Sequence, residues 1–330
     1  MKSMLTILKW IGAVLGILIL VLVIFVNIQG NRTYDAPFPD LVASQDSAII
    51  AHGEYLAFGP AHCASCHAPR EKFDEIESGL VMPLIGGWEL NIPPGFFRAP
   101  NLTPDMETGI GSFTDGQLAR ALRYSVRHNG KALFPFMPFQ NMSDADVVAI
   151  ISFLRSQPPI RNDLKDTELS FLGKAISAFG LIDPEGPATT PPAWVQIDTS
   201  IAYGEYVANS VANCRGCHTM RDLKTGAYTG VPFAGGMSMG SDPMIEGLSF
   251  VSPNITPHLT DGVMAQWSET TFIKRFQAGR IYNGSPMPWG AYARMTEMDL
   301  KALYRYLQSL DPVPGKVMKT VISTEGSQPS

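Results

Sequence analysis

The sequence predicts an all-α protein, in which one N-terminal transmembrane helix is followed by two tandem copies of a small helical domain. An almost purely apolar run from Trp10 to Val26 is close to the length that a helix needs to cross a bilayer. Farther along, residues 50–57 (IAHGEYLA) return as residues 201–208 (IAYGEYVA), at an offset of 151 residues. A chain of 330 residues is long enough for two such copies, each with its own core.

Residues 1–30 are predicted to be an uncleaved membrane anchor, and a cleaved signal peptide is the competing interpretation. The apolar run exceeds the roughly 7–15 residues usual in a signal peptide, and residues 27–30 (NIQG) lack a small-x-small cleavage site. Lys2 and Lys9 precede the run, which favours a cytoplasmic N-terminus. We therefore expect a single pass, with everything after Gly30 on the far side of the membrane.

The repeat divides the rest of the chain into segments. Residues 31–45 are polar, contain two prolines and are predicted to be a tether. Residues 46–157 and 197–311 are the two predicted domains, and residues 158–196 are a Pro-rich linker. The linker contains an amphipathic stretch, Leu169 to Leu181, for which we favour a helix packed across both domains over a helix on a membrane or a partner. Residues 312–330 are predicted to be a disordered tail.

Each copy contains the same elements in the same order. The first helix carries Gly53 or Gly204, where the missing side chain would let the last helix approach closely. The last helix follows Ser143 or Thr296, each with Asp three residues later, which resembles a capping box. Between them we expect Pro- and Gly-rich loops, a helix and a Met-Pro loop. The matching loops and middle helices are 83–87 with 232–236, 100–104 with 253–257, and 117–127 with 269–278.

Each copy also contains a Cys-x-x-Cys-His motif, at Cys63, Cys66 and His67 and at Cys214, Cys217 and His218. This pattern is typical of covalently attached haem c, in which the two thiols form thioethers and the histidine is an axial iron ligand. A redox dithiol and a four-cysteine zinc site are the alternatives. They are disfavoured because the pairs lie 151 residues apart, each pair has its own histidine, and the chain has no other cysteine. The sequence therefore predicts two haem c groups, whose attachment requires an export-side compartment such as a bacterial periplasm.

The second axial ligand is predicted from the repeat, because only two kinds of methionine recur in both copies. Met137 and Met287 lie in proline-bounded loops, 70 and 69 residues after the proximal histidines (137 − 67 and 287 − 218). Met142 and Met295 lie just before the last helix, where a hydrophobic staple explains them as core residues. We therefore predict Met137 and Met287 as the sixth ligands.

The remaining histidines are predicted to have other roles. His128, just ahead of the first Met loop, is the one rival ligand or propionate contact, whereas structural or surface roles are favoured for His52, His62 and His258. Asn101 and Asn254 are expected to line the haems, with hydrogen bonds to nearby backbone or to propionates.

On these motifs, residues 45–311 resemble the membrane-anchored dihaem c-type cytochromes, including cytochrome subunits of bacterial periplasmic dehydrogenase complexes. The resemblance implies two tandem class I cytochrome c domains, with crossed first and last helices. It also implies a relay of single electrons from a dehydrogenase or quinol-oxidising complex to a terminal oxidase or soluble cytochrome. On this interpretation the chain is not an enzyme by itself, and its anchor lies in a bacterial inner membrane with the haem domains in the periplasm.

Other functions are disfavoured by particular features of the sequence. A subunit that mainly docks a dehydrogenase at the membrane would share both cofactors and stays open. A dihaem peroxidase would need an iron with an open coordination position, whereas the Met loops suggest two closed sites. Thiosulfate-oxidising dihaem enzymes use an additional cysteine that this chain lacks. The net charge of −5 and the absence of a Lys/Arg run argue against a nucleic-acid partner.

Overall fold

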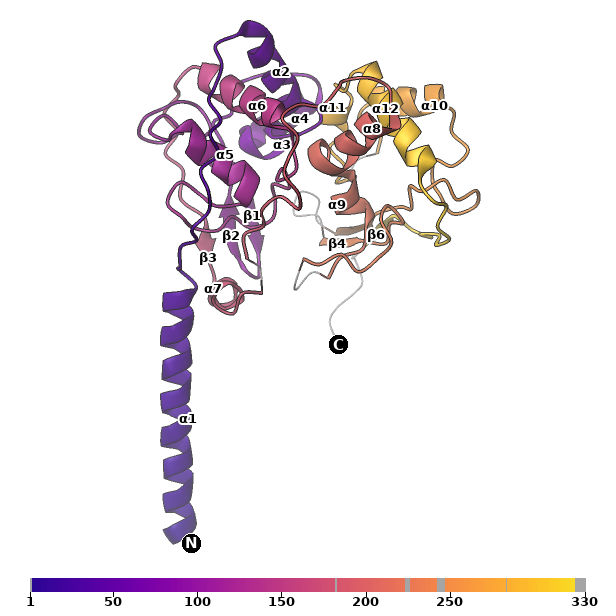
Figure 1. Cartoon of the computed structure of the whole chain (residues 1–330). Coiled ribbons are helices and arrows are strands. Elements are labelled where there is room, and N and C mark those ends of the chain that lie inside the picture. The colour runs from indigo at the N-terminus through magenta and orange to yellow at the C-terminus, as the bar shows by residue number, and fades with distance from the viewer. Residues whose placement is uncertain (1, 182, 223–225, 242–246, 283, 324–330) are drawn as a thin grey trace.

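The computed structural model describes residues 2–181, 183–222, 226–241, 247–282 and 284–323 (Figure 1). Helix α1 (Lys2–Gln29) extends away from the rest of the chain as a separate rod. It contains the predicted apolar run, and its side chains are almost all exposed. Among the described residues, it is the one helix long and apolar enough to cross a membrane.

The first hydrophobic core is built on the crossing of α2 (Ser47–Phe58) and α6 (Asp144–Ser156). A Cβ on Gly53 would lie 1.9 Å from the carbonyl oxygen of Ala149, which no side chain tolerates. The predicted close approach at this glycine is therefore confirmed. The core holds the buried apolar residues of both helices, such as Leu56, Ile150 and Phe153.

The second core repeats this crossing. Helix α8 (Ile201–Tyr206) continues into a π-helical turn, η2 (Val207–Val211), and packs against α12 (Glu297–Ser309). A Cβ on Gly204 would lie 2.0 Å from the carbonyl oxygen of Ala302, so this prediction is confirmed as well. The middle helices α5 (Asp115–Tyr124) and α10 (Glu269–Gln277) pack against α6 and α12 respectively. The shorter helices are α3 (Ala64–His67), η1 (Arg70–Lys72), α4 (Phe73–Glu77), α9 (Cys214–His218) and α11 (Trp289–Tyr292).

The all-α prediction is incomplete, because the described residues also form two small antiparallel sheets. One consists of β1 (Glu89–Ile92), β2 (Gly95–Arg98) and β3 (Glu168–Leu169), with Leu90 opposite Phe97. The other consists of β4 (Ser238–Ser241), β5 (Leu248–Val251) and β6 (Val321–Ser323). Strands of two to four residues are too short to show the alternating pattern by which strands are predicted.

Two of these strands come from segments for which the prediction was different. β3 belongs to the linker, and β6 belongs to the tail that was predicted to be disordered from residue 312. Residues 312–323 are instead held to the second core, since the Asn254 amide also donates to the Val313 carbonyl at 2.8 Å. The rest of the predicted tail, residues 324–330, lies outside the described residues.

The linker helix was predicted in the right place but with the wrong neighbours. Helix α7 (Phe171–Ala178) forms within the amphipathic stretch, with Ser170 as its N-cap. It packs against α1 and against the strand-connecting turn at Pro94, rather than across both cores. Figure 1 shows α7 below the first sheet and beside the inner end of α1.

The two cores meet through a reciprocal pair of tyrosines at the starts of the last helices. Tyr206, from the second copy, accepts a hydrogen bond from the Ser143 backbone N–H at 2.8 Å and donates to Asp146. Tyr55, from the first copy, accepts from the Thr296 N–H at 3.0 Å and donates to the carboxylate of Asp299. The predicted N-caps are confirmed, because the Ser143 and Thr296 oxygens accept from the N–H three residues on. In a capping box the N-cap N–H donates to the side chain three residues on. Here the N–H groups of Ser143 and Thr296 donate instead to a tyrosine of the other copy.

We expect Tyr55→Phe and Tyr206→Phe each to lower the free energy of unfolding by about 1–3 kcal/mol, because a helix N–H and a carboxylate lose their shared partner. Burial and the neighbouring Asp299 raise the pKa of Tyr55, so the hydroxyl stays a donor at neutral pH. Denaturant unfolding followed by circular dichroism measures the effect. Tyr282→Phe is the control, since Tyr282 is 71% exposed. Equal stability of all three variants would contradict the role of the reciprocal tyrosines.

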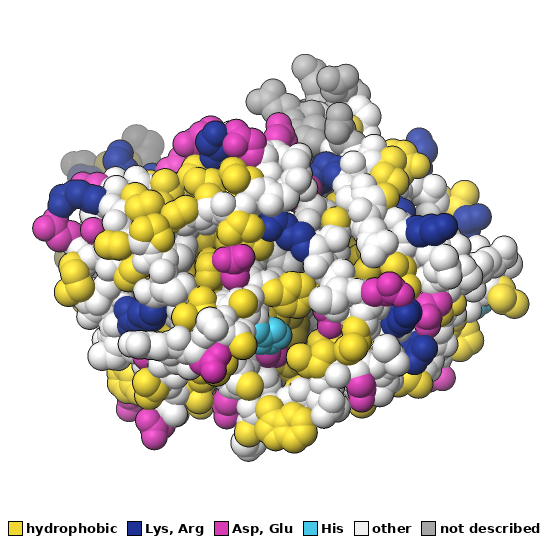
Figure 2. All heavy atoms as spheres, turned by 90° about the horizontal axis from the view of Figure 1, so that it is seen from above, with side chains coloured by type: hydrophobic (Ala, Val, Ile, Leu, Met, Phe, Trp, Pro, Cys, Tyr) yellow, Lys and Arg dark blue, Asp and Glu magenta, His cyan; other side chains and the backbone are white. Residues whose placement is uncertain are grey.

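On the face of the molecule away from α1, the described side chains form no large patch of one charge. Seen from above, acidic and basic side chains are scattered among apolar ones (Figure 2). This distribution agrees with the mild net charge of −5.

Candidate haem-binding sites

The two Cys-x-x-Cys-His motifs form the short helices α3 and α9. In the first, the His67 N–H donates to the Cys63 carbonyl at 2.9 Å, so one helical turn carries both thiols and the imidazole. The residue before each motif has a left-handed backbone, with φ of 42° at His62 and 51° at Asn213. Histidine and asparagine are among the residues that tolerate this conformation best. All four thiols are free of disulfide bonds and available for thioethers.

The histidine of each motif is oriented by a backbone carbonyl. Nδ1 of His67 lies 3.0 Å from the Pro100 oxygen, and Nδ1 of His218 lies 2.9 Å from the Pro253 oxygen. Because a carbonyl can only accept, Nδ1 carries the proton and Nε2 keeps its lone pair for a metal. Burial lowers the pKa of both imidazoles, which keeps them neutral and able to ligate.

A glycine loop brings the proline close to each histidine. The Gly86 N–H donates to the His67 carbonyl, and the Gly235 N–H donates to the His218 carbonyl, both at 2.8 Å. These glycines have φ of 75° and 73°. A Cβ would lie 2.6 Å from the Ala99 oxygen at the first site and 2.4 Å from the Pro253 carbonyl carbon at the second. The matched loops 83–87 and 232–236 therefore hold the Pro loops 100–104 and 253–257 next to His67 and His218 respectively.

The Pro-Asn loops are held by the buried amides of Asn101 and Asn254. Asn101 donates to the Ile160 carbonyl at 2.8 Å, and Asn254 makes the corresponding bond to Val313. Their side-chain oxygens accept from the N–H groups of Thr103 and Thr256, at 3.0 and 2.9 Å. The predicted hydrogen bonds to nearby backbone are confirmed. They hold in place the carbonyls that orient the two histidines.

The thiols do not have the properties of a reactive dithiol. Burial raises the pKa of Cys63 and Cys214 to about 12 and that of Cys66 to about 11. Redox-active Cys-x-x-Cys motifs depend on a lowered thiol pKa. Within the described ranges, no group of three or more His, Cys, Asp or Glu side chains is placed to hold a metal ion.

The two pairs of recurring methionines differ in burial, as their positions in the repeat predict. Met142 and Met295 are 0% and 3% exposed and lie inside the cores, which confirms them as core residues. Met137 and Met287 are half-buried at the edges of the same cores that Cys63 and Cys214 flank. Each predicted ligand thus shares a core with its own attachment motif, and its bond to iron stays a prediction.

The second Met loop is also held from the first copy. The Arg280 guanidinium donates to the Met287 carbonyl at 3.3 Å and is paired with the Glu77 carboxylate at 2.7 Å. Helix α4, which ends at Glu77, packs against α11, which begins just after the Met loop. The relation of the two copies therefore helps to position Met287.

The remaining histidines contact aromatic or acidic side chains of the protein. His128 stacks on Phe113 with ring centroids 3.9 Å apart, and His258 lies 3.5 Å from Asp261 in a loop. His52 bonds Asp146 at 2.7 Å, which raises its pKa. His62 packs edge-on against Tyr292, with centroids 5.8 Å apart.

The contact between His62 and Tyr292 connects the two attachment segments. His62 immediately precedes Cys63, and the Tyr292 hydroxyl donates to the Ala212 carbonyl at 2.6 Å, two residues before Cys214. Burial lowers the pKa of His62 and raises that of Tyr292 well above its usual value, so both side chains stay neutral. The two motifs are therefore linked through a contact between two uncharged side chains.

The residues around the motifs fit haem c. Each site offers two thiols and a neutral imidazole on one short helix, which is the donor set that this cofactor needs. Near the second motif, the buried Nε atoms of Arg215 and Arg221 have no hydrogen-bond partner among the described residues. Both guanidinium groups lie over the Tyr228 ring, at 4.7 and 5.5 Å. A haem propionate carries the kind of acceptor that these two Nε atoms lack among the described residues.

Sequence reasoning missed several of these residues. The Pro100 and Pro253 carbonyls are backbone groups, so their residue type carries no signal, although their place in matched loops could have suggested them. At the 151-residue offset, Arg215 corresponds to Ala64, so the repeat gives no signal for it. Arg221 corresponds to Arg70, because each lies seven residues after the first cysteine of its motif (221 − 214 and 70 − 63). A comparison of the repeats could therefore have singled out Arg221 but not Arg215.

Comparison with known proteins supports the same assignment. Residues 51–158 match the cytochrome c family. The cytochrome c subunit of a quinone-dependent alcohol dehydrogenase of Gluconobacter oxydans is 29% identical over 82% of this chain and 56% of its own length. The cytochrome c subunit of gluconate 2-dehydrogenase of Pantoea cypripedii is 29% identical over 80% of this chain and 60% of its own length.

This chain covers most of the length of a third relative. A dihaem c-type cytochrome of Cereibacter sphaeroides is 27% identical over 83% of this chain and 90% of its own length. The chain thus spans little more than half the length of the two dehydrogenase subunits but most of this smaller protein. Residues 51–158 thus form a cytochrome c domain, and about four fifths of the chain is similar to cytochrome c subunits of dehydrogenase complexes.

Proposed function

We propose that the chain is a dihaem electron carrier, anchored in a bacterial inner membrane by α1, with both haem domains in the periplasm. It relays single electrons from a dehydrogenase or quinol-oxidising complex to a terminal oxidase or soluble cytochrome. The single observation that carries the proposal is the duplicated frame around His67 and His218. Each imidazole is held by a proline carbonyl at 2.9–3.0 Å and belongs to the same helical turn as its own attachment thiols. Two equivalent frames support two haem sites.

In this proposal the chain's own residues bind, orient and insulate the cofactors, and bound haem supplies the one-electron Fe(III)/Fe(II) chemistry. Cys63, Cys66, Cys214 and Cys217 would form the thioethers, and His67 and His218 would be the proximal ligands. Met137 and Met287 would complete the two iron sites from their Pro-bounded loops. The paired Met loops support closed coordination sites, which favours electron transfer over a peroxidase.

The dehydrogenase is the proposed donor because of the relatives. The names of two of them describe cytochrome c subunits of an alcohol and a gluconate dehydrogenase. We propose, as a second form of the same function, that this chain is the cytochrome and anchoring subunit of such a periplasmic complex. Co-purification from solubilised membranes distinguishes the two forms, since a subunit stays with its dehydrogenase and a free carrier does not.

Covalent haem content tests the number of haems. We expect two haems per chain in a pyridine haemochrome assay, and one after Cys63→Ala with Cys66→Ala or after Cys214→Ala with Cys217→Ala, because each motif attaches its own cofactor. Ser65→Ala, between the thiols of the first motif, is the control and should keep both. One haem in the unmodified chain would contradict the dihaem proposal. Rapid peroxide turnover by the isolated protein would contradict the electron-carrier proposal.

A further inference from the structure

Helix α7 presents its large apolar side chains outward and its small ones inward. Phe171, Leu172 and Phe179, the residue that ends the helix, are 51%, 50% and 56% exposed. Gly173, Ser177 and Ala178 are the buried residues of the helix. A helix on a water-facing surface shows the opposite arrangement, with its large apolar side chains against the core. The outward face, formed by Phe171, Leu172 and Phe179, therefore needs an apolar neighbour other than this chain.

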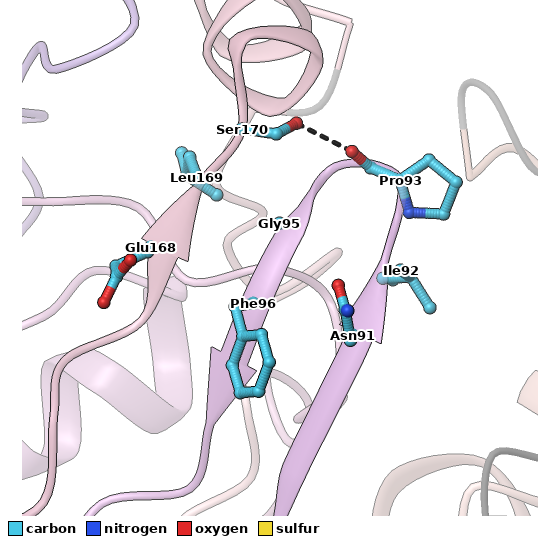
Figure 3. Close-up of a pocket in the computed structure, with 8 residues that line it drawn as sticks. All are labelled: Asn91, Ile92, Pro93, Gly95, Phe96, Glu168, Leu169 and Ser170. Carbon is cyan, nitrogen blue, oxygen red and sulfur yellow. Dashed lines mark hydrogen bonds between the residues drawn. The ribbon is translucent and has the colours of Figure 1, made fainter.

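The inward face fixes α7 to the first sheet. A Cβ on Gly173 would lie 1.9 Å from the Pro94 carbonyl oxygen, so only glycine allows this contact. Ser170 caps the helix, donates through Oγ to the Pro93 carbonyl at 2.7 Å and donates through its N–H to Pro94 at 3.0 Å (Figure 3). Figure 3 shows the helix above the turn that joins β1 and β2. Residues of this turn and of the start of α7 line a pocket of about 470 Å³. The orientation of α7 is thus set by the body of the protein.

Helix α7 also contacts the C-terminal end of α1. The rings of Phe25 and Phe179 lie 5.5 Å apart, and Lys174 Nζ donates to the Asn27 side-chain oxygen at 3.0 Å. Val26 is fully buried, although nearly all of α1 around it is exposed. In Figure 1, α1 is seen from the side and α7 end-on, so the two helices lie crosswise.

We propose that the outward face of α7 lies in the surface of the lipid bilayer that α1 crosses. This inference rests on the proposed anchoring by α1 and adds a second membrane contact to it. Phe25 is four residues from the end of α1, or about 6 Å along its axis. Helices that lie in a membrane interface are buried by about 5–10 Å. When α1 spans the bilayer, the contact between the Phe25 and Phe179 rings therefore places Phe179 at an interfacial depth.

A polar cluster of Arg32, Tyr34 and Asp183 lies next to the apolar surfaces of α1 and α7, where we place the boundary between lipid and water. Arg32, just beyond α1, is paired with the Asp183 carboxylate. The Tyr34 hydroxyl donates to the same carboxylate at 2.9 Å. These groups follow α1 and α7 in the chain and join the two segments. A continuous apolar surface on α1 and α7, bounded by a polar cluster, fits a lipid surface better than a protein partner. The two contacts would hold the first haem domain at one height and orientation over the membrane.

Spin-label accessibility tests the proposal on the full chain in vesicles of phosphatidylcholine and phosphatidylglycerol. A nitroxide is attached to Leu172→Cys, and in a separate protein to Leu259→Cys, whose native side chain is 73% exposed on the second copy. We expect the label at position 172 to collide with oxygen several-fold more often, relative to a water-soluble nickel chelate, than the label at position 259. Both proteins are checked for unchanged haem content.

The outcomes separate this inference from the proposed function. Vesicles that retain the chain after alkaline washing, with equal water exposure of both labels, would overturn docking of α7 and leave the anchor intact. Protection of position 172 from both reagents, with dipolar broadening between labels, would show a second copy on this face and would also overturn it. A chain that washes off the vesicles would disprove the anchor, and the docking of α7 with it, while the haem assay would still report on the haem sites.

Discussion

Gly53→Ala is expected to destabilise the protein by roughly 3–5 kcal/mol or more, because the new methyl group meets backbone rather than a movable side chain. Its Cβ would lie 1.9 Å from the Ala149 carbonyl oxygen and 2.9 Å from the Phe153 Cβ. The overlap can be relieved only if α2 and α6 separate, which would open the first core. Gly204→Ala should do the same to the second core, where the Ala302 oxygen is 2.0 Å away.

Denaturant unfolding of both variants measures this effect, and haem absorbance reports whether each core still holds its cofactor. Ala51→Gly is the matched control, since Ala51 is an exposed residue of the same helix. It should cost only about 1 kcal/mol, through helix propensity alone. If Gly53→Ala were no more costly than Ala51→Gly, the close packing of α2 against α6 would be disproved.

Met137→His and Met287→His are each expected to keep both haems and to lower the reduction potential of one of them. Histidine is a stronger donor than a thioether and favours Fe(III), so replacement of an axial Met lowers the potential. A drop on the order of 0.1 V or more is well inside the roughly 0.8 V range that axial ligands cover. A spectroelectrochemical titration of the full chain resolves the two one-electron steps and shows which one moves.

The other recurring methionines are the matched controls for this experiment. Met142→Leu and Met295→Leu replace core residues that are 0% and 3% exposed. These substitutions nearly conserve volume, so they should cost less than about 1.5 kcal/mol and leave both potentials in place. An unchanged potential in Met137→His would show that another side chain completes the first iron site. His128→Ala would then be the next variant to measure.

Local patterns were enough to predict the elements that depend on nearby residues. The caps at Ser143 and Thr296 need only an oxygen and an N–H three residues on, so a short segment specifies them. The glycines that permit helix crossing were predicted because they recur at one offset on matched helices. Both are confirmed by the structure, as are the hydrogen bonds that the side-chain oxygens of Asn101 and Asn254 accept from the N–H groups of Thr103 and Thr256.

Other features could not be predicted, because they join residues far apart in the chain. The carboxylates Asp146 and Asp299 were expected to complete local capping boxes. They instead accept hydrogen bonds from Tyr206 and Tyr55, which lie in the opposite copy. Likewise, α7 has an amphipathic sequence that suits several neighbours, and its actual contact with α1 joins Phe179 to Phe25 across most of the first domain.

The sequence by itself determined the attachment chemistry, since two thiols and an imidazole within five residues are sufficient to identify a haem c motif. It also determined the repeat, and through the repeat it singled out Met137 and Met287. Tertiary structure alone decided which carbonyls orient His67 and His218, where α7 lies, and how the two copies meet. The physical reason is that these features depend on backbone groups and on contacts between distant segments, whose energies are set when the chain is packed and leave no periodic pattern in the order of its residues.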